Sequence, residues 1–243
     1  MKIDEDVELY LFKGKDIVID EFIILKSHSL DYIIEEVGYR RYMSLLYYIC
    51  NTPYELRTQL YKEGVLYIDI THWQLFINFF SEGKDKIMKE IFDKFLSLNF
   101  NDYVLKTYDG EVVIENIKTN HKIDEFKFLY IISILREYGG LGNKKEPIFG
   151  NKTGLIYDIE REQRRITKGR FKSKTTLKSI MSSISWNSNI NIFQIWKLTL
   201  YQLYDGLSSK VKRDNYDNIM LGIYTGNIKN DSIDFNKESW FNK

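Results

Sequence analysis

The stretch SLDYIIEEVGYRRYMSLLYYI, residues 29–49, decides the class of fold. Its apolar side chains recur at the helical spacing i, i+3, i+4 and i+7, first within 30–37 and again within 42–49. Ser29 is a residue type that caps helix N-termini, and Gly38 between the two runs marks a weak point or a close contact. The stretch therefore predicts a helical core.

Two further helix starts carry a capping box, in which a Thr and an acid or amide three residues later cap each other's backbone. Thr52 and Glu55 form the first, with Pro53 in the first helical position. Thr71 and Gln74 form the second. Apolar periodicity predicts more helices over residues 84–98, 124–138, 155–169 and 175–185.

Near the end of the chain, Asn191 is the expected start of a long helix. Its core-facing side chains are expected to be Ile192, Ile195, Trp196, Leu203 and Leu207. A shorter helix is predicted over 213–224, followed by a tail with Trp240 and Phe241.

Two β-hairpins are expected beside the helices. Alternating apolar residues at 7–12 and 16–25, separated by Gly14, predict the first. The stretch YVLKTYDGEVVIENI at 103–117 predicts the second, because its central Asp-Gly pair tolerates the positive φ of a type I′ turn. The expected fold class is α+β, mainly α-helical, with one or two small hairpins.

A glycine-containing loop with Pro147 at residues 139–154 is the expected boundary between two subdomains. The N-terminal one, 1–140, would hold the early hairpin, a set of helices and the 103–117 hairpin. The C-terminal one, 141–243, would be helical.

The composition indicates a globular protein, with 44% apolar and 28% charged residues. The chain has no Ala, which points to a low-GC genome because Ala codons are GC-rich. That bias also inflates Lys, Tyr and Phe. No apolar run reaches the roughly 18 residues of a membrane span, and no signal peptide is expected.

The net charge of +1 hides a basic segment, because residues 161–178 hold eight bases and one acid. Its candidate partner-binding residues are Arg161, Arg164, Arg165, Lys168, Arg170, Lys172 and Lys174. Phosphates would fit such a segment, but Phe171 is its one aromatic residue for base stacking. A solvated or protein-facing surface is the favoured interpretation, and nucleic-acid binding the alternative.

Motifs for small-molecule chemistry fail on spacing. FGNKTG at 149–154 lacks the glycine spacing of a P-loop, and Gly140 and Gly142 follow a helix, unlike a dinucleotide fingerprint. Lone Cys50 lies in an apolar run and is expected to be buried. We therefore expect no cofactor.

The three histidines have no His or Cys partner at a metal-ligand spacing. His28 and His72 are expected to be capping or solvent-exposed residues, and His121 lies in a polar link. No metal site is predicted from them.

A carboxylate nuclease is the remaining enzymatic alternative, with Asp158, Glu160, Glu162 and the following Lys168 as its candidate residues. On a helix, positions 158 and 162 share a face whereas 160 points away. Arginines are interleaved among these acids, so a surface helix with internal ion pairs is the favoured interpretation.

The chain resembles virion or tail-assembly proteins of long-tailed phages that infect low-GC bacteria. The resemblance lies in the following stretches: the 29–49 stretch, ITHWQLFINFF at 70–80, QIWKLTLYQLYDGL at 194–207, GNIK, ID and the final Trp240. It implies a structural part of the tail, connector or baseplate, or a chaperone for a tail component, and it carries over no active-site residue.

From this resemblance we expect a non-enzymatic phage protein that contacts other virion or tail proteins, as a homo- or hetero-oligomer. It would be found in the virion or in the host cytoplasm during assembly. The alternatives are a nucleic-acid-associated phage protein using 161–178 and, third, a metal-dependent nuclease.

Overall fold

The computed structural model describes residues 3–81, 85–142, 146–168, 176–187, 190–228 and 233–235. Its α-helices are α1 (Glu5–Phe12), α2 (Leu30–Tyr32), α3 (Tyr39–Cys50), α4 (Arg57–Lys62), α5 (His72–Ser81), α6 (Asp85–Ile91), α7 (Glu125–Tyr138), α8 (Lys152–Thr167), α9 (Leu177–Asn187), α10 (Ile192–Ile195) and α11 (Leu200–Tyr224). Its strands are β1 (Ile17–Val18), β2 (Ile24–Leu25), β3 (Tyr103–Tyr108), β4 (Glu111–Asn116) and β5 (Lys122–Ile123). The fold is α+β and mainly helical, as the sequence predicts.

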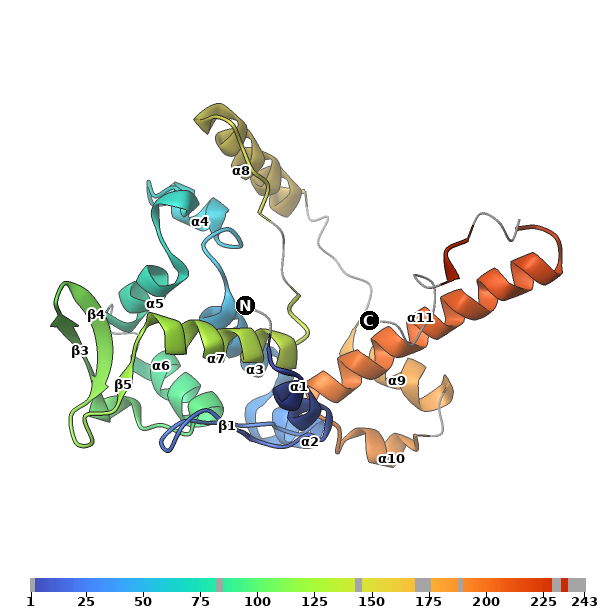
Figure 1. The fold of residues 1–243 in the computed structure, drawn as a ribbon, viewed down its shortest axis with the longest axis horizontal. Helices are drawn as coiled ribbons and strands as arrows, with labels where there is room; N and C mark the ends of the chain where they lie inside the picture. Colours follow the sequence, from blue (N-terminus) through green and yellow to red (C-terminus); the bar gives the residue numbers. More distant parts are fainter. Residues whose placement is uncertain are drawn as a thin grey trace.

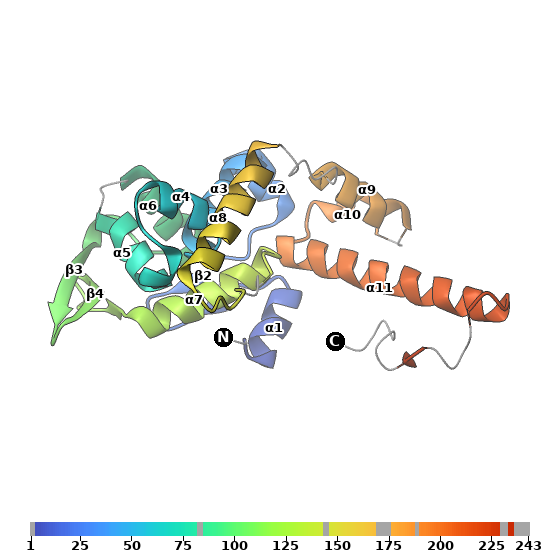
Figure 2. The ribbon, with the colours of Figure 1, turned by 90° about the horizontal axis from the view of Figure 1, so that it is seen from above.

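Helix α7 lies along the middle of the molecule, with α3 and α5 packed against it (Figure 1). The three-stranded antiparallel sheet, in the order β3-β4-β5, stands at one end. At the other end α9, α10 and α11 extend away from the body, as the view from above also shows (Figure 2). The chain thus has a compact centre and a helical extension.

The 29–49 stretch forms helix as predicted. The Ser29 hydroxyl accepts a hydrogen bond from the Tyr32 backbone N–H, and α2 continues into a π-helical turn at Ile33–Val37. Gly38, with a φ of 82°, separates this turn from α3. On α3 the side chains of Tyr42, Leu45, Leu46 and Ile49 are buried. The apolar side chains that recur at helical spacing are therefore the ones that face the core.

The prediction of a strand at residues 7–12 is wrong, because this segment is helix α1. Asp4 caps it by accepting a hydrogen bond from the Asp6 N–H, and acids fill its first turn, where they complement the helix dipole. Leu11 is its one buried residue, so the alternating pattern did not reflect a buried strand face.

Both small sheets form around short turns. The first hairpin pairs β1 with β2, inside the predicted 16–25 segment, and the Asp20 carboxylate accepts hydrogen bonds from the N–H groups of Phe22 and Ile23 in its turn. The 103–117 hairpin is confirmed as β3 and β4, with positive φ at Asp109 and Gly110.

The predicted single helix from Asn191 is interrupted. Asn191 caps the short α10, and a second capping box, Thr199 with Gln202, starts α11. The break is held by backbone hydrogen bonds from Leu30 N–H to Leu198 and from Asp31 N–H to Trp196. The predicted 213–224 helix is the end of α11.

Of the five core-facing residues expected here, Ile195 and Leu203 are buried and Leu207 is partly buried against the core, whereas Ile192 is 49% exposed and Trp196 37%. Both of these expectations were wrong, because the interruption of the helix changes which face meets the body. Trp240 and Phe241 lie outside the described residues.

Buried apolar residues form one large cluster that runs from α1 to α11. A second cluster joins α4, α5 and α8 through Tyr54, Leu60, Tyr67, Leu75, Leu155 and Ile159. Each cluster contains residues from before and after the loop at 139–154. The division into subdomains 1–140 and 141–243 stays a prediction.

Arg136 on α7 is a buried cation that joins three segments. Its guanidinium donates hydrogen bonds to the Cys50 carbonyl at 2.6 Å, to the Glu55 carboxylate at 2.8 and 3.1 Å, and to the Gly142 carbonyl at 2.6 Å. Glu55 in turn caps the Thr52 N–H. The end of α3, the turn before α4 and the loop after α7 are thereby held together.

Replacing Arg136 with Met should lower the free energy of unfolding by about 3–5 kcal/mol, because Glu55 would remain buried without its cation. Urea denaturation measures this change. The matched control is Arg164→Met on the exposed face of α8, which should cost about 0.5 kcal/mol or less. Equal losses in the two variants would contradict this account of Arg136.

Candidate protein-docking surface

Helix α9 has one face against the body. Ile180, Met181 and Ile184 are buried there, and α9 packs against both α10 and α11. The sequence spacing i, i+1, i+4 places these side chains on one side of a helix, as predicted. The opposite side of α9 is turned outward.

Large apolar side chains are exposed at the end of α9 and around α10. Trp186 is 82% exposed and Phe193 78%. Ile192 and Trp196 add smaller exposed areas. We call the three aromatic residues Trp186, Phe193 and Trp196, together with the aliphatic Ile192 beside them, the exposed aromatic group. Exposed aromatic side chains of this size favour burial against a partner, because each would remove a large apolar area from water.

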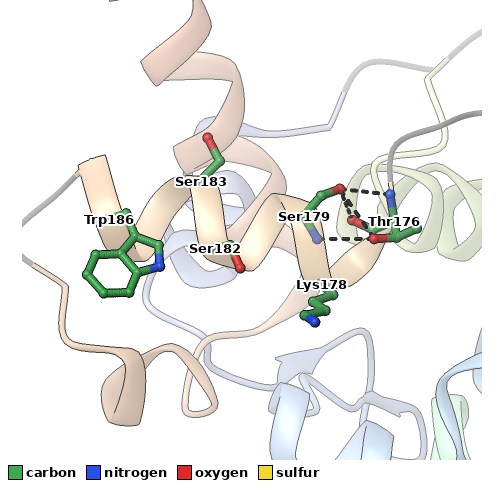
Figure 3. Close-up of a pocket in the computed structure, with 6 residues that line it drawn as sticks. All are labelled: Thr176, Lys178, Ser179, Ser182, Ser183 and Trp186. Carbon is green, nitrogen blue, oxygen red and sulfur yellow. Dashed lines mark hydrogen bonds between the residues drawn. The ribbon is translucent and has the colours of Figure 1, made fainter.

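A shallow hollow of about 550 Å³ lies along the outward side of α9 (Figure 3). Thr176 and Ser179 line one end, where they are hydrogen-bonded to each other, and Trp186 lines the other. Lys178 is the ionisable residue among the described residues that line it. The hollow is open and offers a contact surface without a paired acid and base.

The outer half of α11 continues this exposed region. Val211, Leu221 and Tyr224 are exposed on it. Lys210 pairs with Asp214 one turn later, and Arg213 lies 3.9 Å from Asp217. Such i, i+4 pairs support a helix that extends into solvent. Only its first turns, with Leu200, Tyr201 and Leu203, reach the core.

Part of the predicted basic segment lies on the last turns of α8. Arg161, Arg164, Arg165 and Lys168 are all exposed. Arg164 pairs with Glu160 and Arg165 with Glu162, so two of these charges have carboxylate partners on their own helix. Arg170, Lys172 and Lys174 lie outside the described residues. No observation tests the partner-binding role predicted for this segment.

Two of the three candidate nuclease carboxylates form ion pairs that join α8 to α4. Asp158 and Glu162 share a face of α8 and both contact the guanidinium of Arg57, at 2.9 and 3.3 Å. Glu160 points away, as predicted, and pairs with Arg164. Within the described residues no group of three His, Cys, Asp or Glu side chains is placed to hold a metal ion.

His28 and His72 are packed among aromatic rings, contrary to the expectation of capping or solvent-exposed residues. His28 stacks on Tyr32, with its Nδ1 3.1 Å from the Tyr42 hydroxyl. His72 meets the ring of Phe128 edge-on. Burial lowers the pKa of each imidazole to about 4.

His121 lies in a buried polar network. Its Nδ1 is 3.1 Å from the Tyr103 hydroxyl and its Nε2 3.0 Å from the Asp20 carboxylate, which Lys127 also contacts at 2.7 Å. Although burial opposes ionisation, the hydrogen bond from Lys127 and those from the turn hold the pKa of Asp20 well below its usual range. The network fastens the β1–β2 turn to the sheet and to α7.

Cys50 is fully buried, as predicted. Burial raises the pKa of its thiol, so the reactive thiolate is disfavoured. None of the described helices is both long and apolar enough to cross a bilayer.

The chain is a mainly helical α+β protein in which α9, α10 and α11 expose several large apolar side chains. Residues 170–243 match the family model of the YomV second domain. The match covers under a third of the chain and includes α9, α10 and α11. It indicates a phage-type protein. Searches of curated proteins and of solved structures gave no match.

Sequence reasoning missed the exposed aromatic group, although one signal for it existed. Trp186 follows the buried Ile184 by two positions, which is 200° around a helix at 100° per residue. That position is opposite the core face. For Ile192 and Trp196 no such signal existed, because the interruption before α11 depends on contacts with residues 30 and 31.

The low pKa values of His28 and His72 make stability depend on pH. In the unfolded chain both imidazoles should titrate near 6.5, and in the folded chain near 4. Between these values only the unfolded state binds the protons, so the free energy of unfolding should fall as pH is lowered from about 6.5 to about 4.

Urea unfolding measured across this pH range checks the effect. His72→Gln should reduce the slope to roughly half, since one of the two coupled protons is lost. A slope that is unchanged by His72→Gln would show that other groups cause it. The carboxyl of Asp20 affects the free energy of unfolding below this pH range, because its pKa is lowered in the folded chain.

Proposed function

We propose that the chain is a non-enzymatic phage structural or tail/baseplate-assembly protein that acts through protein–protein contacts. The observation that carries the proposal is the position of the exposed aromatic group. Its four residues lie within the region that matches the YomV second domain, on helices that extend from the body.

The energetics of the surface support docking. Trp and other aromatic residues contribute most at the centres of protein interfaces. Trp186 and Phe193 lie in solvent on helical segments, so little backbone conformational entropy remains to be lost on binding. The hollow beside Trp186 can receive a side chain from the partner.

We propose no catalytic role for the acids and histidines of the chain. The acids and histidines that catalysis would require have structural partners: Asp158 and Glu162 contact Arg57, and His121 joins Tyr103 to Asp20. These contacts account for the positions of these groups without a reaction.

Other virion or tail proteins are the proposed partners, and the virion or the host cytoplasm during assembly is the proposed location. The resemblance in apolar spacing and the family match support this setting. A permanent virion component would be present in purified particles, whereas an assembly chaperone would be bound to a tail protein in infected cells and absent from particles.

The experiment combines particle mass spectrometry with affinity purification of the tagged chain from infected cells. We expect the chain in particles at stoichiometric amounts, or one dominant tail or virion protein in the purification. The variant Trp186→Ser/Phe193→Ser should reduce that recovery at least tenfold. The control Leu9→Ser/Tyr157→Ser removes two exposed apolar side chains elsewhere and should leave it unchanged.

Equal recovery with the two double variants, at equal melting temperature, would reject the docking surface. Salt-dependent DNA binding that Arg161→Glu, Arg164→Glu and Arg165→Glu abolish would instead favour the nucleic-acid alternative. Mg²⁺-dependent cleavage lost in Asp158→Ala would favour the nuclease.

A further inference from the structure

Strand β4 is only partly covered on the side of β5. Strand β5 pairs with Ile114 and Glu115 and then ends, because the chain turns into α7 at Glu125. Among the described residues, no strand lies beside Glu111–Val113 on that side. An uncovered strand segment of this kind can accept another strand.

A cleft of about 580 Å³ lies beside this segment of β4. Its walls are α5, the 110–113 part of the hairpin and the first turns of α7. We call this space the β4 cleft. The β3–β4 hairpin, which lines the cleft, stands at one end of the molecule, and α9 and α10 stand at the other (Figure 1).

The backbone N–H and carbonyl of Val112 point to the side of β4 on which the cleft lies. Further along the same strand, the Asn116 N–H donates to the His121 carbonyl across the β4–β5 side. Hydrogen-bonding groups alternate in direction along an antiparallel strand, so those of Val112 point to this side too. The Val112 carbonyl already accepts from the indole N–H of the buried Trp73 at 3.2 Å, so the Val112 N–H is the group of this residue that remains to donate to a carbonyl of an incoming segment.

Apolar side chains line the cleft and its rim. Trp73 and Ile77 come from α5, and Phe126 and Leu129 from α7. Phe126 is 71% exposed and Leu129 36%. Side chains of an added strand alternate between its two faces, so every second one would contact this apolar lining.

The ionisable residues that line the cleft are all acids: Glu111, Asp124 and Glu125. Asp124 caps α7, where its carboxylate accepts a hydrogen bond from the Lys127 N–H. The nearby lysines are engaged elsewhere, Lys122 over the Tyr108 ring and Lys127 on Asp20. The charge at the cleft therefore complements a cationic segment.

We propose that the β4 cleft binds an extended, cationic segment of a partner protein, which lies beside Glu111–Val113 and accepts a hydrogen bond from the Val112 N–H. Basic side chains of the segment face the three acids, and alternate apolar side chains contact Trp73, Ile77 and Phe126. The site is separate from the exposed aromatic group, so it gives the protein a second contact of different chemistry.

The test uses a fluorescently labelled ten-residue peptide that alternates Lys with Val and Thr, and measures its anisotropy with the full chain in low salt. We expect saturable binding that weakens as salt is added. The same peptide with Glu in place of Lys should bind at least tenfold more weakly.

The variant Glu111→Lys/Glu125→Lys should lose at least tenfold in affinity for the Lys peptide. The control Glu35→Lys/Glu36→Lys changes the net charge equally at exposed residues outside the cleft and should retain affinity within twofold. Circular dichroism and melting temperature establish that both variants are folded. Trp186→Ser/Phe193→Ser should bind the peptide normally, which separates this site from the proposed function.

Two results would overturn the proposal: no binding at millimolar peptide, or equal affinity of the two charge variants. Self-association of the chain that the cleft variant alone abolishes would also overturn it, because the occupant would then be a second copy.

Discussion

The buried cation of Arg136 is the constraint on which the centre of the structure depends. Its guanidinium binds the Cys50 carbonyl, the Glu55 carboxylate and the Gly142 carbonyl, so it fixes the chain where three segments change direction. Two residues further along α7, the Tyr138 hydroxyl donates to the His28 carbonyl and accepts from Tyr42. Helix α7 therefore positions both the helices before it and the loop after it.

With the centre of the molecule held by α7, the proposed contact surfaces lie at its two ends. At one end β5 stops early because the chain enters α7, and the β4 cleft results. At the other end the Thr199 capping box starts α11 next to residues 29–31, and only its first turns are buried. The apolar side chains of α9 and α10 that do not face the body remain exposed.

Features set by local chemistry were predictable from the sequence. The Asp109-Gly110 turn and the boxes at Thr52 and Thr71 need only residues within four positions of each other, and all three formed, although α4 begins at Arg57 and not at Pro53 as predicted. Features set by distant contacts were not. The break before Thr199 depends on a hydrogen bond from Leu30. Arg136 binds Glu55 and Cys50, which lie 81 and 86 positions before it in the chain. The exposure of Trp186 could be inferred from helical spacing. The β4 cleft could not, because it depends on where β5 ends.

The central claim is that the extension formed by α9, α10 and α11 faces a protein partner. The most direct measurement replaces Trp186 with a photo-crosslinking amino acid in infected cells and identifies the captured molecule by mass spectrometry. The account predicts one dominant phage virion or tail protein, with little capture from the same probe at exposed Tyr157 on α8. Equal capture from both positions, or crosslinking to nucleic acid at position 186, would contradict it.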